Sequence, residues 1–126
     1  MTPSQVLREY WARMNDRDWD GMRALLAPDV VVEWTSSNER FVGPDNVVGV
    51  NADYPDGWSI RVRSIVAEGD TVVSDLEVPM AGVGEFRAAC FATVTGGLIT
   101  SSVEYWIGVG ADEPAAWRAK YAEPRT

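Results

Sequence analysis

Apolar residues recur at helical spacing near the start of the chain. They follow an i, i+3, i+4, i+7 pattern, which is typical of an amphipathic helix with one buried stripe. This stripe comprises Val6, Leu7, Tyr10, Trp11 and Met14. The pattern predicts a first helix over residues 4–15.

Two shorter helices are predicted further along. Asp18 is suited to cap a helix over residues 19–26, which Pro28 ends. Pro44 predicts the start of another helix over residues 44–53, because proline suits the first helical position. The stripe of this third helix carries Val47, Val50, Asn51 and Tyr54. Asn51 is polar on that stripe, and it serves either a local backbone bond or a ligand.

Strand-like segments dominate the rest of the chain. Residues 30–34 alternate so that Val30, Val32 and Trp34 share one face, and the polar run 35–40 after them is predicted as a loop. Four more segments are joined by short turns, which predicts an antiparallel meander. They cover residues 59–67, 71–79, 85–95 and 98–109.

The order of these elements predicts an α+β fold in one domain, 1–126. We expect a long, strongly curved antiparallel sheet that wraps the N-terminal helices and leaves a cone-shaped cavity. The tail, residues 111–126, either closes over the sheet or frays.

Composition and charge narrow the classes of function. A net charge of −8 argues against nucleic acid and against anionic membranes, both of which attract Lys and Arg. No signal peptide or transmembrane run is visible, so we expect a cytoplasmic protein. The chain has no histidine, which removes Ser–His and Cys–His catalysis and the usual zinc sites. Its single cysteine, Cys90, lies in an apolar strand and is interpreted first as a buried hydrophobe.

Glu104 stands out as a carboxylate within an aromatic strand, on the same face as Ser102 and Trp106. Its direction depends on the turn before it. A two-residue turn at Gly96-Gly97 places Glu104 opposite Ala89, at the surface. A three-residue turn with a glycine bulge places it on the face of Cys90, where small residues leave room for a ligand. We favour the second arrangement.

Asp75 and Glu77 pose the same question on the strand 71–79. Simple alternation places both on the solvent face. A two-residue turn within residues 81–84 would instead place them with Cys90 and Ala88, as a carboxylate pair whose shifted pKa values suit acid/base catalysis. Arg61 and Arg63 would complete a charged network. We rank both carboxylates below Glu104.

Several short motifs give the chain a resemblance to the SnoaL-like polyketide cyclases of the nuclear transport factor 2-like superfamily. The resemblance covers residues 5–108 and rests on Asp18-Trp19-Asp20, residues 25–30, Phe41-Val42-Gly43, Glu68-Gly69-Asp70, and Gly96-Gly97-Leu98-Ile99 followed by Glu104-Tyr105-Trp106. It implies the cystatin-like cone, which hosts isomerases, dehydratases, epoxide hydrolases, cyclases and non-enzymatic binders.

The resemblance also implies an acid/base carboxylate on the last strand, five residues after the isoleucine of the Gly-x-Ile turn. Counting from Ile99, that position is Glu104. The family usually has aspartate there with histidine two residues earlier, whereas this chain has glutamate and Ser102.

The predicted catalytic residues are therefore Glu104, then Glu77 and Asp75. The predicted pocket residues are Tyr10, Met14, Trp34, Asn51, Tyr54, Trp58, Cys90, Ser102 and Trp106. We expect a small enzyme without cofactor or metal, acting by acid/base chemistry on a hydrophobic carbonyl-type or polycyclic molecule, with Asn51 or a tyrosine hydroxyl steadying an oxyanion. The alternative is a non-catalytic ligand-binding or dimerisation module. Families of this fold also lead us to expect a homodimer.

Overall fold

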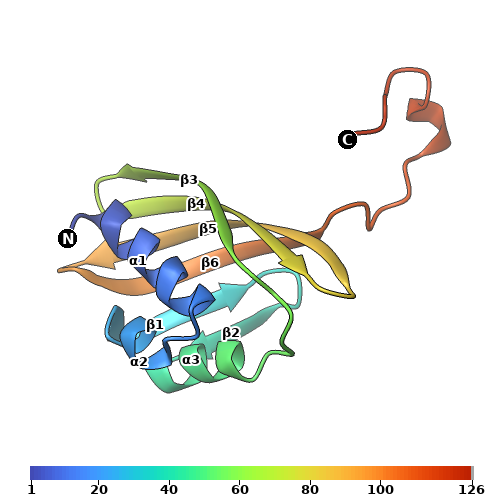
Figure 1. Ribbon diagram of the computed structural model, residues 1–126. Helices are drawn as coiled ribbons and strands as arrows, with labels where there is room; N and C mark the ends of the chain where they lie inside the picture. The colour runs from blue at the N-terminus through green and yellow to red at the C-terminus, as the bar shows by residue number, and fades with distance from the viewer. Residues whose placement is uncertain (126) are drawn as a thin grey trace.

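The computed structural model describes residues 1–125. Three helices and six strands make up its body, and a single 3-10 turn, η1, lies in the tail (Figure 1). In chain order they are α1 (Pro3–Asn15), α2 (Trp19–Arg23), β1 (Leu26–Trp34), β2 (Glu39–Val42), α3 (Pro44–Ala52), β3 (Arg61–Glu68), β4 (Thr71–Met80), β5 (Gly84–Thr95), β6 (Leu98–Gly108) and η1 (Ala116–Arg118). The predicted α+β class is confirmed.

Helix α1 has the buried stripe that its spacing predicted, and it begins at Pro3, one residue before the predicted start. Thr2 caps its first turn: the Thr2 hydroxyl accepts from the Gln5 backbone N–H, and the Gln5 side chain accepts from the Thr2 N–H. All five stripe residues are buried. The Trp11 indole N–H donates to the Ser74 hydroxyl at 3.0 Å, which fixes α1 to the sheet at β4.

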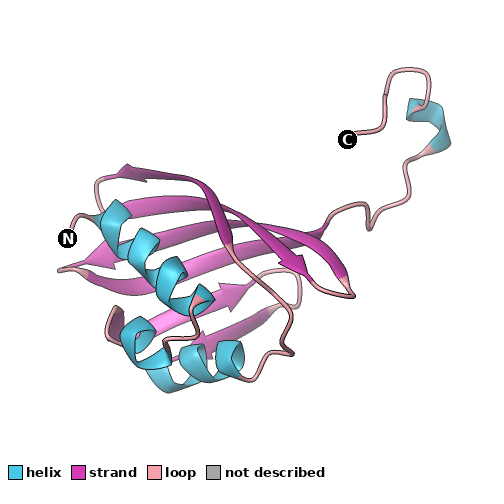
Figure 2. Cartoon of the chain, in the orientation of Figure 1, coloured by secondary structure: helices cyan, strands magenta, loops and turns pink. Residues whose placement is uncertain are grey.

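The six strands form one curved, unclosed sheet in the order β2-β1-β6-β5-β4-β3, and the helices lie against one face (Figure 2). We call this covered face the inner face and the opposite one the outer face. Strands β3 to β6 form the predicted antiparallel meander. The β1–β6 pair is parallel, which corrects the expectation of a wholly antiparallel sheet.

Two elements in the first part of the chain differ from the predictions. Helix α2 stops at Arg23, and Leu25 and Leu26 are buried beyond its end because Leu26 already pairs with Ile99 of β6. The polar run expected to be a loop contains β2, which forms a hairpin with β1 around residues 35–38. Asn38, in the left-handed region at φ 58°, suits that tight turn.

Residues 109–125 form the tail, which leaves the body of the molecule rather than closing over the sheet (Figure 1). Its large side chains are exposed, with Trp117 at 71% and Tyr121 at 76%. No helix in the described part of the chain is long and apolar enough to cross a membrane.

Candidate active site

Glu104 lies on the inner face of the sheet, in the middle of β6. Its neighbours across the ladder are Trp34 on β1 and Cys90 on β5. Only 4% of the residue is exposed. The favoured orientation of Glu104 toward the face of Cys90 is therefore confirmed.

The cause of that orientation differs from the prediction. The Gly96-Gly97 turn has two residues, since Thr95 pairs with Leu98. The register shifts later, where Thr93 pairs with Ser101 and Thr100 is left over as a β-bulge. The bulge moves every following residue of β6 by one position, so Glu104 faces Cys90 instead of Ala89.

Three side chains donate hydrogen bonds to the Glu104 carboxyl. The indole N–H groups of Trp34 and Trp106 both donate to Oε1 at 3.1 Å. The Ser102 hydroxyl donates to Oε2 at 3.3 Å. These donors come from β1 and β6, so the sheet itself holds the carboxyl in one position.

Burial has the largest effect on the pKa of this carboxyl. It raises the pKa of Glu104 above its ordinary value of 4.5, while the bonds from Trp106, Ser102 and Trp34 oppose the change. Burial, aided by the nearby Glu104 charge, also raises the pKa of Tyr10 and of Cys90. A carboxyl with a raised pKa exchanges protons nearer to neutral pH, as a general acid or base requires.

Glu104 lies at the wall of a cavity of about 550 Å³ between the helices and the inner face. This volume suits a small organic molecule. The lining residues are Trp11, Met14, Trp34, Ser36, Ser37, Glu39, Asn51, Tyr54, Trp58, Ile60, Val78, Met80, Phe86, Glu104, Trp106, Ile107 and Gly108. Trp11 and Glu104 are buried, whereas Ser36, Ser37 and Glu39 are exposed, so the β1–β2 turn stands at the mouth.

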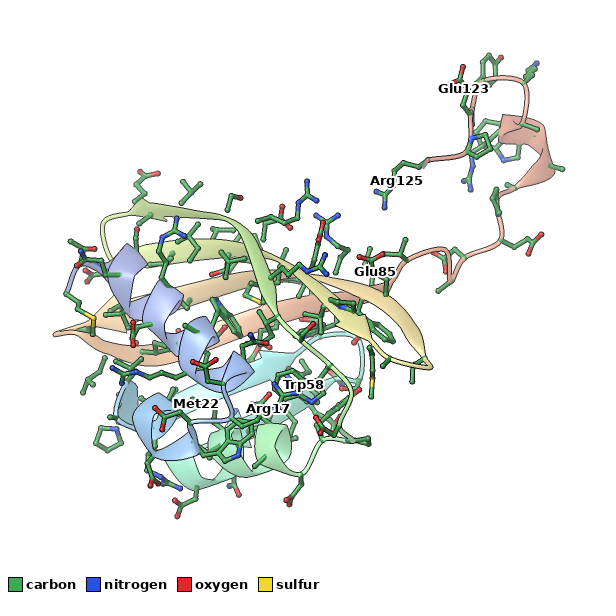
Figure 3. All side chains as sticks on the ribbon, viewed as in Figure 1. Arg17, Met22, Trp58, Glu85, Glu123 and Arg125 are labelled. Carbon is green, nitrogen blue, oxygen red and sulfur yellow. The ribbon has the colours of Figure 1, made fainter. Side chains whose placement is uncertain are left out.

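Residues at the C-terminal end of α1 and just beyond it position one wall of the cavity. The Arg17 guanidinium stacks on the Trp58 ring at 3.5 Å and donates to the Trp58 carbonyl at 2.6 Å (Figure 3). The Asn15 side chain accepts from the Ile60 backbone N–H at 2.8 Å. These contacts fix Trp58 and the segment that leads into β3.

Most of the predicted pocket residues line this cavity. They are Met14, Trp34, Asn51, Tyr54, Trp58 and Trp106. Tyr10, Cys90 and Ser102 are buried without belonging to its lining. Asn51 combines both interpretations, because its amide donates to the Val47 carbonyl at 2.8 Å and the side chain still lines the cavity.

Asp75 and Glu77 do not reach the cavity, so the predicted carboxylate pair beside Cys90 is wrong. The β4–β5 turn leaves three residues between Met80 and Gly84, and Asp75 therefore pairs with Ala89 on the outer face. Arg87 donates to Asp75 at 2.9 Å, and Arg63 pairs with Glu77. Simple alternation, which placed both carboxylates on the solvent face, is confirmed.

Sequence reasoning missed several cavity residues. Trp11 was assigned only to the helix stripe, although the same stripe borders the cavity. Phe86 lies four residues before Cys90 on β5, so alternation alone places both on one face and was a usable signal. Glu39 lies in a strand that the sequence did not predict, and no local pattern marks it.

Metal ligands do not gather in the described part of the chain. Among residues 1–125, no group of three or more His, Cys, Asp or Glu side chains is placed to hold a metal ion. The predicted absence of metal and cofactor remains a prediction.

The model of the SnoaL-like domain family matches residues 7–102. The chain belongs to this family. No curated protein matches it.

Solved structures share the fold along most of the chain. A protein from Kribbella flavida, provisionally named a ketosteroid isomerase, is 27% identical with a TM-score of 0.89, over 98% of this chain and 90% of that one. An LEH-like epoxide hydrolase from M. tuberculosis is 18% identical with a TM-score of 0.73, over 83% and 82%. A provisionally named SnoaL-like polyketide cyclase from Shewanella denitrificans is 11% identical with a TM-score of 0.72, over 83% and 90%.

Proposed function

We propose that the protein is a small enzyme that moves a proton on a hydrophobic carbonyl-type or polycyclic molecule, with Glu104 as general acid or base. One observation carries the proposal: a carboxyl 4% exposed, held by three donors, at the wall of an aromatic-lined cavity. Burying a carboxyl costs desolvation free energy, so its burial does not stabilise the fold. A buried carboxyl at a cavity is therefore a candidate for a functional group. Isomerisation, cyclisation, dehydration and hydrolysis all use this proton transfer.

Two further side chains are suited to the developing negative charge of an enolate. Asn51 uses one amide N–H on the Val47 carbonyl, which leaves its second N–H for a ligand. Tyr54 lines the cavity and offers a hydroxyl. Donors aimed at an oxyanion typically contribute about 3 kcal/mol to transition-state stabilisation.

The names of structural relatives support a reaction of this class. They include a provisionally named ketosteroid isomerase, an epoxide hydrolase and a provisionally named polyketide cyclase. All three names describe chemistry on small organic molecules, and the cavity here is lined mainly by apolar and aromatic side chains. The likeness supports the class of reaction.

Hydrogen–deuterium exchange tests the proposal. The purified protein is incubated in D₂O with a panel of cyclic and polycyclic ketones, and loss of α-protons is followed by NMR. We expect exchange above the buffer rate, with Glu104→Gln slower by about 10²–10⁴-fold. Glu77→Gln is the matched control, because it removes the same charge from the outer face. Unchanged exchange in Glu104→Gln, or none with any ketone, would contradict the proposal.

A second candidate function, a binding or dimerisation module, is favoured by the outer face. Val66, Val73, Phe91 and Val103 form an apolar row across β3 to β6 in register. Val66 is 65% exposed and Phe91 45%. A homodimer through this row is a proposal that sedimentation of the wild type and of Phe91→Asp tests, with dissociation expected in the variant.

The ligand class and the cellular location of the protein are also proposals. A hydrophobic small molecule is the proposed ligand, and the cytoplasm is the proposed location. Fractionation of cells that produce the full chain would test the location directly.

A further inference from the structure

The charges at the cavity wall are of one sign. Its charged lining residues are Glu104 at the buried end and Glu39 near the mouth, while no Lys or Arg belongs to the described lining. Arg17 stacks on Trp58 and also binds Asp56, which offsets its charge. A ligand inside the cavity therefore meets no positive side chain, and it meets negative charge at Glu104 once that carboxyl is ionised.

The rings around Glu104 add to that potential. Trp34 and Trp106 direct their in-plane N–H groups at the carboxyl, which leaves their π faces free of this bond. Tyr54 and Trp58 also line the cavity, and the Trp58 ring stacks with the Arg17 guanidinium. The π face of an aromatic ring is negative, and rings grouped in this way bind alkylated ammonium groups.

Other titratable groups near Glu104 do not supply a positive charge. Tyr10 on α1 and Cys90 on β5 have raised pKa values, so both are neutral in ordinary buffers. The carboxyl is thus buried with hydrogen-bond donors and, among the described residues, without a counter-ion. A cation placed beside it would offset the cost of burying its charge.

We propose that the cavity binds a hydrophobic organic cation, with its alkylated nitrogen between the Glu104 carboxylate and the faces of Trp34 and Trp106. The inference rests on the proposed function, because it names the substrate class of the same site. The apolar part of the ligand fills the space beside Met14, Ile60 and Phe86. A substituted ammonium fits better than a primary one, because the wall offers rings for its methyl groups.

An isosteric pair of probes tests this charge preference. 4-Hydroxyphenyltrimethylammonium and 4-tert-butylphenol share their shape and differ in one positive charge. Calorimetry with the wild type should show the cation binding at least about tenfold more tightly, the factor expected for a cation beside rings and a carboxylate. Equal affinity, or no binding of the cation at millimolar concentration, would overturn the inference.

Variants then locate the preference. In Glu104→Gln the preference for the cation should fall at least about threefold, because the carboxylate is gone while the rings and the shape of the cavity are kept. Glu77→Gln on the outer face should keep the wild-type preference. A preference that is undiminished in Glu104→Gln, or that falls only in Glu39→Gln, would overturn the placement. The preference for the cation would then come from the net charge of the protein or from Glu39 at the mouth of the cavity.

The pH dependence of the wild type needs no variant and guards against misfolding of Glu104→Gln. Affinity for the cation should rise as the pH increases above 4.5, the ordinary pKa of the carboxyl, because Glu104 loses its proton, and affinity for the neutral probe should not. A flat profile for the cation would contradict the inference. Ketone exchange separates the two claims: lost charge preference with intact exchange refutes only the inference, and the reverse result refutes only the proposed function.

Discussion

The two faces of the same sheet treat carboxylates in opposite ways. On the outer face, Asp75 and Glu77 pair with arginines at the protein surface, with side chains that are 42% and 20% exposed. On the inner face, Glu104 meets two indoles and a serine, away from solvent. The residue types hardly differ. The comparison teaches that position on the ladder, within one residue, separates a surface ion pair from a candidate catalytic group.

The energetic consequences differ as well. Exposed ion pairs contribute about 0 to 1 kcal/mol because water screens them. A buried carboxyl instead carries a desolvation cost that only its hydrogen bonds offset. The inner face is therefore where a change of charge should matter most.

Adding a carboxylate to the inner face should change the free energy of unfolding more than any other substitution considered. Cys90→Asp places a second acid opposite Glu104 in the buried layer, and we expect it to destabilise the protein by about 3 kcal/mol or more. Ala89→Asp places an acid opposite Asp75 on the exposed outer face, so it repeats the like-charge pair in water and should cost only about 1 kcal/mol. Urea unfolding measures both. Similar losses in the two variants would break the comparison.

Removing one donor from Glu104 should give the next largest effect. Trp34→Phe keeps an aromatic ring and deletes the bond to Oε1, at an expected cost of about 1.5–3 kcal/mol. The loss also raises the pKa of Glu104 further, so the pH profile of ketone exchange should move to higher pH. Trp117→Phe in the exposed tail is the control, and its profile should coincide with the wild type.

The raised pKa of Glu104 should appear in the pH dependence of stability. Above 4.5 the unfolded carboxyl loses its proton while the folded one keeps it, so wild-type stability falls as pH rises toward the folded pKa. Glu104→Gln lacks this loss. As the pH rises, the free energy of unfolding of Glu104→Gln should therefore increase relative to that of the wild type. The total increase should be about 1.4 kcal/mol for each pH unit that separates the pKa of Glu104 in the unfolded state from its pKa in the folded state. A constant difference in urea titrations from about pH 4 to pH 8 would contradict this.

The outer face should give the smallest effect. Glu77→Gln removes the pairing with Arg63, and we expect a loss below about 1 kcal/mol. The loss should shrink further in about 1 M salt, where charges are screened over about 3 Å. A larger, salt-independent loss in urea unfolding would mean that this network is more than a surface pair.

Local patterns predicted the elements that depend on local chemistry. The apolar spacing of α1, the alternation of β4 and the turn glycines of the meander all act over a few residues, and each led to the right element. The resemblance to SnoaL-like proteins supplied the curved sheet and the position of Glu104.

Features set by distant pairing could not be predicted in the same way. Strand β2 is polar and short, and it exists because β1 offers an edge. The parallel pairing of β1 with β6 brings Trp34 beside Glu104 across 70 positions of the chain. The bulge at Thr100 has no glycine to mark it in the sequence. The inner face was therefore predicted for Glu104 from a three-residue turn, whereas the turn has two residues and the bulge shifts the register.

That bulge gives the segment between the glycine turn and Glu104 a tolerance in length. If Thr100 were deleted, a straight ladder from the two-residue turn would still pair the same acid with Cys90, since only the leftover residue is lost. Chains one residue shorter here can therefore present their acid to the same hollow. A search for relatives that counts a fixed number of positions would overlook them, whereas one that superposes the strands would not.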